Sequence, residues 1–140
     1  MAKENELVIE AKVEKLQQVK KFVVSQLEET DFKMKTKMHL ELAVEEIFTN
    51  ISNYAFKTGV GEVTIKTSLS DDKTELTVTF EDGGIEYNPL KHKDPDVTLP
   101  GSERKIGGLG IFMTKKVTDE IAYKYEDGKN ILQIKKNLTS

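Results

Sequence analysis

The sequence has 140 residues, a formal net charge of −3 and no cysteine, and 37% of its residues are hydrophobic. This composition suits one domain with a packed core over residues 1–140, and the lack of cysteine excludes disulfides, thiol catalysis and cysteine-ligated zinc. The acidic balance argues against a nucleic-acid partner. No apolar run is long enough for a signal peptide or a membrane span, so we expect no membrane association and a cytoplasmic location.

The first part of the chain predicts one strand and two helices. Leu7–Glu10 has the composition of a short strand, and apolar residues recur at helical spacing over Val13–Glu29. A second helix is predicted over Lys33–Phe56, and it should end before the glycine-containing turn at 59–61.

The second part of the chain predicts two hairpins separated by a long loop and a helix. Apolar and polar residues alternate over Glu62–Leu69 and Glu75–Phe80, which gives the first hairpin. The loop from 82 to 104 holds all three prolines, and the helix of 111–119 leads to a closing hairpin of 121–125 and 131–136. This order predicts an α+β fold with helices on one face of a largely antiparallel sheet. The hairpin residues expected to face the core are Val63, Ile65, Leu76, Val78 and Phe80.

Polar residues interrupt the second helix in the stretch EEIFTNISNYAF, Glu45–Phe56. Glu46 and Asn50 are four residues apart, so their side chains should lie on one face of the helix, one turn apart. Taken alone, this polar face is most simply explained as a solvated surface. The neighbouring residues expected to pack on the core are Ile47, Ile51 and Tyr54.

A second polar group follows the strand Glu75–Phe80. Asp82 is followed by Gly83 and Gly84, which let the backbone turn and approach a neighbour closely. A simple turn explains these residues on their own. Alternatively, Asp82 lies at the bottom of a pocket and accepts a hydrogen bond from an exocyclic amine, which distinguishes adenine from guanine.

A third group is the glycine-rich stretch Gly107–Gly110 at the start of the third helix. Backbone N–H groups at a helix start, together with the helix dipole, favour an anion there. The stretch is neither a P-loop nor a dinucleotide-binding fingerprint, because no Gly-Lys-Ser/Thr follows and no strand leads directly into it. A flexible hinge before the helix is the alternative explanation.

In this order, the three groups resemble the N, G1 and G2 boxes of the GHKL ATPase superfamily, which includes gyrase B, Hsp90, histidine kinases and MutL. The resemblance extends from about Leu7 to Lys136. It implies the Bergerat (histidine kinase-like ATPase) fold, a two-layer α/β sandwich with a largely antiparallel mixed sheet, and ATP and Mg²⁺ as cofactors. Within the superfamily, the chain is most similar to the short single-domain anti-sigma factor serine kinases of bacterial partner-switching systems.

The resemblance implies a role for individual residues. Asn50 would supply an oxygen ligand to Mg²⁺, and Glu46 would take the proton of the attacking hydroxyl group, whereas Glu45 should face solvent or lie behind the site. Asp82 would bind the adenine amine, with Gly84 allowing close approach. The remaining residues implied to bind the nucleotide are Asn53, Arg104, Lys105, Gly108, Leu109 and Gly110.

Other positions around these boxes match the family in part. Tyr87 and Pro89 match the aromatic residue and the proline that usually follow the G1 box, and Asp94–Lys105 matches the ATP lid. Many relatives have His where this chain has Tyr54. A tyrosine does not titrate near neutral pH, so any role that requires an imidazole is in doubt.

Three functions are compatible with these features. The first is a protein serine/threonine kinase that phosphorylates an antagonist protein on a Ser or Thr and sequesters a sigma factor when free. The second is an ATP-dependent protein-binding regulator in which phosphoryl transfer is slow or absent. Glu46 favours the first, because a binding module has no need of a base at that position.

The third function, a detached histidine-kinase catalytic domain, is disfavoured. The residues before Lys33 are already used by the strand and the first helix, so they leave no pair of phosphoacceptor helices, and neither His39 nor His92 is placed as an acceptor. The resemblance also suggests a homodimer, with the strand Glu6–Glu10 as a free sheet edge.

Overall fold

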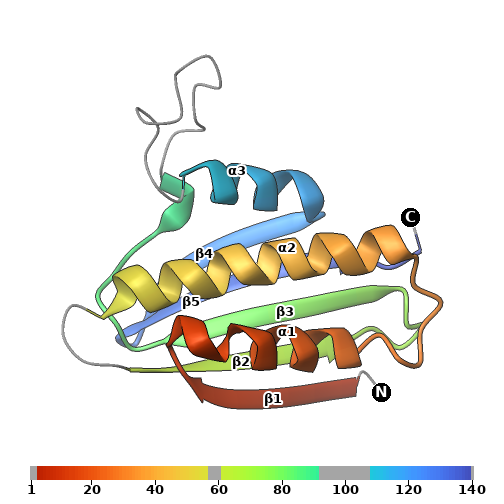
Figure 1. Cartoon of the computed structure of the whole chain (residues 1–140), viewed down its shortest axis with the longest axis horizontal. Helices are drawn as coiled ribbons and strands as arrows, with labels where there is room; N and C mark the ends of the chain where they lie inside the picture. Colours follow the sequence, from red (N-terminus) through yellow and green to blue (C-terminus); the bar gives the residue numbers. More distant parts are fainter. Residues whose placement is uncertain (1–2, 57–60, 92–107, 140) are drawn as a thin grey trace.

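The computed structural model describes residues 3–56, 61–91 and 108–139, which form a sheet and a layer of helices (Figure 1). The strands are β1 (Lys3–Glu10), β2 (Glu62–Leu69), β3 (Glu75–Asp82), β4 (Glu120–Glu126) and β5 (Lys129–Asn137). The α-helices are α1 (Leu16–Ser25), α2 (Met34–Asn50) and α3 (Gly108–Val117). Three short helices complete the described residues: η1 (Val13–Lys15), η2 (Ile51–Ala55) and η3 (Pro89–Lys91).

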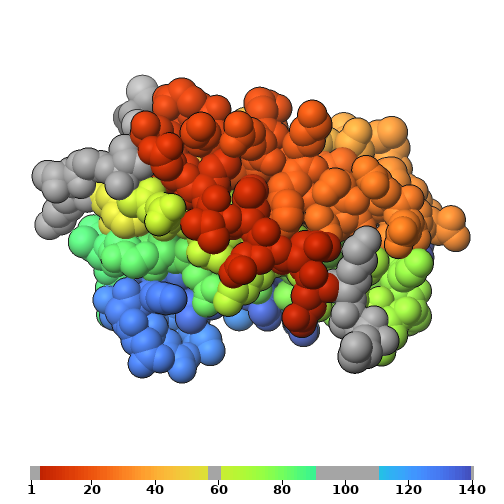
Figure 2. All heavy atoms as spheres, turned by 90° about the horizontal axis from the view of Figure 1, so that it is seen from below, coloured from red at the N-terminus to blue at the C-terminus, as the bar shows by residue number. Residues whose placement is uncertain are grey.

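The described strands form one sheet in the order β1-β2-β3-β5-β4, and every pairing within it is antiparallel. α2 lies between α1 and α3, and the three helices cover the same face of the sheet (Figure 1). Seen edge on in Figure 2, the red and orange helical residues occupy one side of the molecule and the green and blue sheet residues the other. The prediction of an α+β sandwich with helices on one face is confirmed, but the sheet of the described residues is antiparallel throughout rather than mixed.

The core lies between α2 and the central strands. The alternation in β2 and β3 buries the five predicted residues, of which Phe80 alone contributes about 2–3 kcal/mol. α2 adds a buried stripe that includes Leu40, Val44, Ile47 and Phe48. On the opposite, open face of the sheet most side chains are polar, although the exposed Val8 also lies there, and Lys66 Nζ pairs with Glu81 Oε2 at 2.7 Å. β1 is an edge strand, as predicted, because β2 is its partner on one side and no described strand lies on the other.

Two predicted boundaries near the N-terminus differ from the structure. β1 begins at Lys3, earlier than the predicted Leu7, because it pairs along the whole of β2. α1 ends at Ser25, earlier than Glu29. After Ser25 the backbone hydrogen bonds span three residues instead of four, as where the N–H of Gln26 donates to the carbonyl of Val23. The Ser25 hydroxyl also donates to the Phe22 carbonyl.

The end of the second helix also differs from its prediction, and the difference shapes the site. The α-helix stops at Asn50 and continues as the π-helix η2, rather than running as one helix to Phe56. The wider π-turn changes the direction of the side chains that follow it. Tyr54 is therefore 36% exposed, and its prediction as a core residue is wrong.

Among the described helices, none combines the length and the apolar character needed to cross a bilayer.

Candidate functional site

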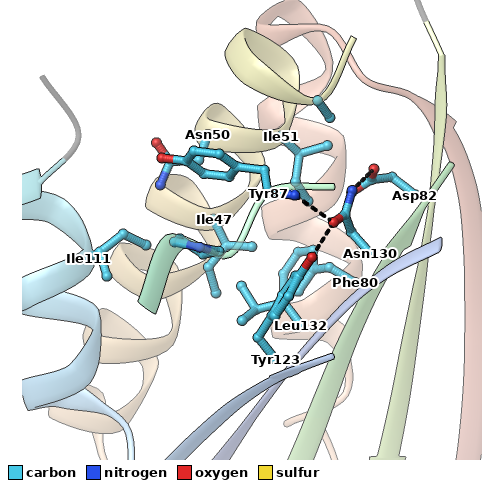
Figure 3. A pocket seen from close by; sticks show the side chains of 12 residues that line it. Ile47, Asn50, Ile51, Phe80, Asp82, Tyr87, Ile111, Tyr123, Asn130 and Leu132 are labelled. Carbon is cyan, nitrogen blue, oxygen red and sulfur yellow. Dashed lines mark hydrogen bonds between the residues drawn. The ribbon is translucent and has the colours of Figure 1, made fainter. Parts of the chain in front are cut away.

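A small pocket lies where the end of α2, the segment after β3 and the start of β5 meet (Figure 3). Its volume is about 30 Å³, room for about two water molecules. Most of the lining is apolar, with a few polar side chains that converge on it. The lining residues are Ile47, Asn50, Ile51, Ala55, Phe80, Asp82, Tyr87, Pro89, Ile111, Tyr123, Asn130 and Leu132.

α2 supplies the polar wall of the site. Asn50, the last residue of α2, is only 8% exposed and lines the pocket, and Glu46 precedes it by one helical turn. The predicted pairing of these two residues on one helix face is therefore consistent with the structure. Glu45 points elsewhere, since it is exposed and its Oε2 lies 3.4 Å from Lys20 Nζ.

The surroundings of the Glu46 carboxylate favour its protonated form. The carboxylate is half-buried, and its Oε1 atom is buried without a hydrogen bond from any described residue. Loss of hydration raises the pKa of Glu46, the Asn50 side chain opposes the rise, and the Glu45 charge adds to it. An unpartnered oxygen with a raised proton affinity is a candidate acceptor for a substrate proton.

Asp82 lies at the floor of the pocket. It continues the buried alternation of β3 as that strand's last residue and is 5% exposed. Its Oδ1 accepts hydrogen bonds from Asn130 Nδ2 at 3.0 Å and from the Gly84 N–H at 2.9 Å. Its Oδ2 accepts none from the residues that the structure describes, so this oxygen is the one left for a ligand. Burial raises the pKa of Asp82, and the two hydrogen bonds counteract that rise.

The segment after Asp82 crosses the end of α2 at very short range. A Cβ atom on Gly84 would lie 2.1 Å from the Ala55 carbonyl oxygen, and the Ile85 N–H donates to that same oxygen at 2.8 Å. Only glycine permits this approach, whereas a Cβ on Gly83 would meet nothing within 4 Å. The close approach expected at Gly84 thus occurs against the protein's own backbone.

Tyr87 and Tyr54 form a stacked pair at one side of the pocket. Tyr87 lines it, and its ring stacks on that of Tyr54 with centroids 5.8 Å apart and an angle of 26°. Burial raises the pKa of Tyr87, with smaller contributions from Tyr54 and Glu46. Tyr54 itself does not line the pocket, so its part in the site is to pack against Tyr87.

Asn130 is a pocket residue that was not predicted from the sequence. It is 5% exposed, stands directly opposite Asp82 in the β3–β5 pairing, and bonds to Asp82, Ile85, Tyr87 and Tyr123. The signal was present in the alternation, because Asn130 occupies the same face of β5 as the buried Leu132 and Ile134. A polar residue at a core-facing position of a strand is unusual and indicates a buried network.

The other predicted nucleotide-binding residues are placed only in part. Asn53 is exposed and is not among the pocket-lining residues, so the structure does not bring it to this pocket. α3 begins at Gly108, which puts the predicted Gly108, Leu109 and Gly110 in its first turn. Arg104, Lys105 and His92, together with the lid segment from 94 to 105, lie outside the described residues.

The site has few groups of its own for a metal ion. Among the described residues there is no cluster of three or more His, Cys, Asp or Glu that could hold one. A single amide oxygen at Asn50 fits Mg²⁺ only if phosphates and water supply the other ligands, which is the usual coordination of this ion beside a nucleotide.

Residues 9–136 match the family described as the histidine kinase-like ATPase domain. The serine-protein kinase RsbW of Bacillus cereus (strain ATCC 10987 / NRS 248) is 31% identical over 98 residues, which are 69% of this chain and 61% of that protein. RsbW of B. cereus strain AH187 is 26% identical over 132 residues, 93% of this chain and 82% of that protein. The chain thus spans about three fifths of the length of the first of these curated relatives.

Solved structures show the same fold at lower sequence identity. The RsbU and RsbW domains of Rv1364c from Mycobacterium tuberculosis match with a TM-score of 0.64 at 14% identity, over 96% of this chain and 32% of that chain. The blue-light activated histidine kinase from Erythrobacter litoralis matches with a TM-score of 0.59 at 18% identity, over 91% of this chain and 61% of that chain. The family match over residues 9–136 establishes that the chain belongs to the histidine kinase-like ATPase domain family.

Proposed function

We propose that this protein binds ATP with Mg²⁺ and transfers the γ-phosphoryl group to a serine or threonine of an antagonist protein in a bacterial partner-switching system. One observation carries the proposal. Glu46, with its unpartnered Oε1, lies one turn from the buried Asn50 on the wall of a pocket that has Asp82 at its floor. Around one site, Glu46 would accept a proton, Asn50 would bind the metal ion and the Asp82 carboxylate would bind the adenine amine.

Asp82 would select the nucleobase. Its free Oδ2 is an acceptor, and adenine offers an amine donor at the position where guanine carries a carbonyl oxygen. With guanine, the carbonyl oxygen would face Asp82 Oδ2. Both atoms are acceptors, so neither would have a hydrogen bond in this buried place and the affinity would fall. GTP should therefore bind more weakly than ATP.

The triphosphate would lie between α2 and α3. Asn50 would hold Mg²⁺, whose charge offsets that of the phosphates, while the N–H groups at Gly108, Leu109 and Gly110 would donate to phosphate oxygens. Arg104 or Lys105 would contact the γ-phosphate. A ligand of this size exceeds the present pocket, so binding would require the pocket to widen on the side of the phosphates.

In the transfer step, the substrate hydroxyl oxygen would form a bond to the γ-phosphorus as the bond from that phosphorus to the bridging oxygen breaks and ADP leaves. The hydroxyl proton would pass to the Glu46 carboxylate. The raised pKa of Glu46 supports this role, because a general base is most effective when its pKa lies close to the pH at which the enzyme works.

The partners in this proposal are proteins. The RsbW relatives are named serine-protein kinases, and their identity of about 30% supports an antagonist protein as the phosphoacceptor. In its unphosphorylated form that antagonist would compete with a sigma factor for this chain. A homodimer also belongs to the proposal, and the free edge of β1 is compatible with it.

Phosphoryl transfer from γ-labelled ATP to a candidate antagonist tests the proposal. Glu46→Gln should lower single-turnover transfer by about a hundredfold, in the range of a lost general base, with the affinity for ATP nearly unchanged. Glu45→Gln is the matched control, because it removes the adjacent, exposed carboxylate, which makes the smallest of the contributions to the pKa of Glu46. It should transfer at close to the normal rate. Tight ATP binding with no transfer by the unmodified protein would favour the ATP-dependent binding regulator instead.

A further inference from the structure

The side-chain amide of Asn130 joins four parts of the pocket. Its Nδ2 donates to Asp82 Oδ1 at 3.0 Å and to the Ile85 carbonyl at 2.7 Å. Its Oδ1 accepts from the Tyr87 N–H at 3.0 Å and from the Tyr123 hydroxyl. These bonds connect the end of β3, the segment that follows it and β4 to the first residues of β5 (Figure 3).

These four bonds use the whole capacity of the amide, which has two donor hydrogens and two acceptor positions. Asn130 therefore has nothing left to offer a ligand, although it lines the pocket. Asp82 differs in this respect, because Asn130 and the Gly84 N–H occupy Oδ1 and leave Oδ2. Rotation of the carboxylate would break two bonds in a buried place, so its orientation is fixed.

We propose that Asn130 is a positioning residue for nucleobase selectivity, which holds the Asp82 carboxylate with Oδ2 toward the base and locks the segment of Ile85 and Tyr87 beside it. The proposal rests on the proposed ATP site and assigns to Asn130 no contact with the nucleotide. It differs from a purely structural role, in which Asn130 would stabilise the fold while selectivity stayed unchanged.

Burial and charge support this assignment. Asp82 is 5% exposed, and its hydrogen bond from Asn130 is the larger of the two that counteract the effect of burial on the pKa of the carboxyl. Besides Asp82, the ionisable groups around the amide are Tyr87 and Tyr123. Tyr54 and Glu46 act on Tyr87, and Glu86 and Tyr125 act on Tyr123. Burial raises the pKa of Tyr87 and Tyr123, so they remain neutral below pH 8.

The test is the ratio of GTP to ATP dissociation constants, measured by calorimetry with Mg²⁺ between about pH 5.5 and 8. Asn130→Asp keeps the shape and both acceptors but replaces the donor to Asp82 with a second carboxylate. At about pH 8 the ratio should fall about tenfold, the value of one hydrogen bond to a charged group. Toward about pH 5.5 the selectivity should recover, because a proton shared by the two carboxyls restores the donor.

Gln133→Glu is the matched control. It makes the same amide-to-carboxylate change on β5, at a side chain that bonds to Thr79 on the open face of the sheet. It should retain the unmodified ratio at every pH. A melting curve for each variant without nucleotide shows whether the fold is intact.

The outcomes separate this proposal from the proposed function. If the unmodified protein binds no ATP, both proposals fail. If it prefers ATP and Asn130→Asp keeps the same ratio at every pH, only the role of Asn130 fails, and the same holds if the lost selectivity does not return at low pH. Should Asn130→Asp not fold, Tyr123→Phe provides the test, because it removes only the hydroxyl that donates to Asn130. Its ratio should fall a few-fold, and an unchanged ratio would overturn the proposal.

Discussion

Gly84 lies against the carbonyl oxygen of Ala55 so closely that a Cβ atom on Gly84 would be 2.1 Å from that oxygen. The contact brings the segment after β3 to the end of the π-helix η2, and the Ile85 N–H secures it with a hydrogen bond to the same oxygen. Asp82 at one end of the segment and Tyr87 at the other therefore depend on a backbone-to-backbone contact.

Gly84→Ala should break this contact. The added methyl group must displace backbone atoms, a form of overpacking that costs about 1–3 kcal/mol in free energy of unfolding. Chemical denaturation of the two proteins measures the difference. Gly83→Ala is the control, since its Cβ would meet nothing within 4 Å, and it should leave the free energy of unfolding nearly unchanged. Equal effects of the two substitutions would contradict the close approach.

Glu46→Gln should stabilise the protein at neutral pH. The raised pKa of Glu46 means that the folded state holds its proton more tightly than the unfolded state, so ionisation costs stability as pH rises from about 4.5 through the raised value. Removing the charge should therefore increase the free energy of unfolding at pH 7 and raise Tm relative to the unmodified protein.

The same substitution should lose this advantage in acid. Below about pH 4.5 Glu46 is protonated in both states, so the Tm values of Glu46→Gln and of the unmodified protein should converge. Glu45→Gln at an exposed position should show no comparable gain at pH 7. A Glu46→Gln variant less stable than the unmodified protein at pH 7 would contradict the burial of the carboxylate.

Tyr54→His should leave the affinity for Mg²⁺-ATP within about threefold, because Tyr54 is 36% exposed and does not line the pocket. Tyr87→Ala should weaken binding about tenfold or more, since that ring lines the pocket and stacks on Tyr54. Calorimetric titrations compare the two variants. If Tyr54→His lost binding as strongly as Tyr87→Ala, the position would have a direct role in the site.

The predictable part of the fold is the part with a strong local pattern. Strict alternation placed β2 at its observed bounds, and it identified the buried faces of β2 and β3. The change from α-helix to π-helix after Asn50 has no comparable pattern, because Ile51 and Tyr54 continue the helical spacing of Ile47. The contact of η2 with Gly84 involves residues far apart in the chain, and no local periodicity reports it.

The site follows the same division. Glu46, Asn50 and Asp82 belong to recognisable local motifs, and their elements bring them to one pocket or its edge. Asn130 was missed because its partner Asp82 is 48 residues away, and only the pairing of β3 with β5 places them opposite each other. Asn130 lies on the same face of β5 as Leu132 and Ile134, and this position in the strand pattern indicates that it is buried.

The most direct test of an ATP site at Asn50 and Asp82 is the melting temperature with and without Mg²⁺-ATP. A ligand at about 100 times its Kd adds about 2.7 kcal/mol to the stability of the folded state, which is a rise of several degrees. We predict a Mg²⁺-dependent rise with ATP that is smaller with GTP and is lost in Asn50→Ala. No shift at millimolar ATP, or an equal shift in Asn50→Ala, would contradict the proposed site.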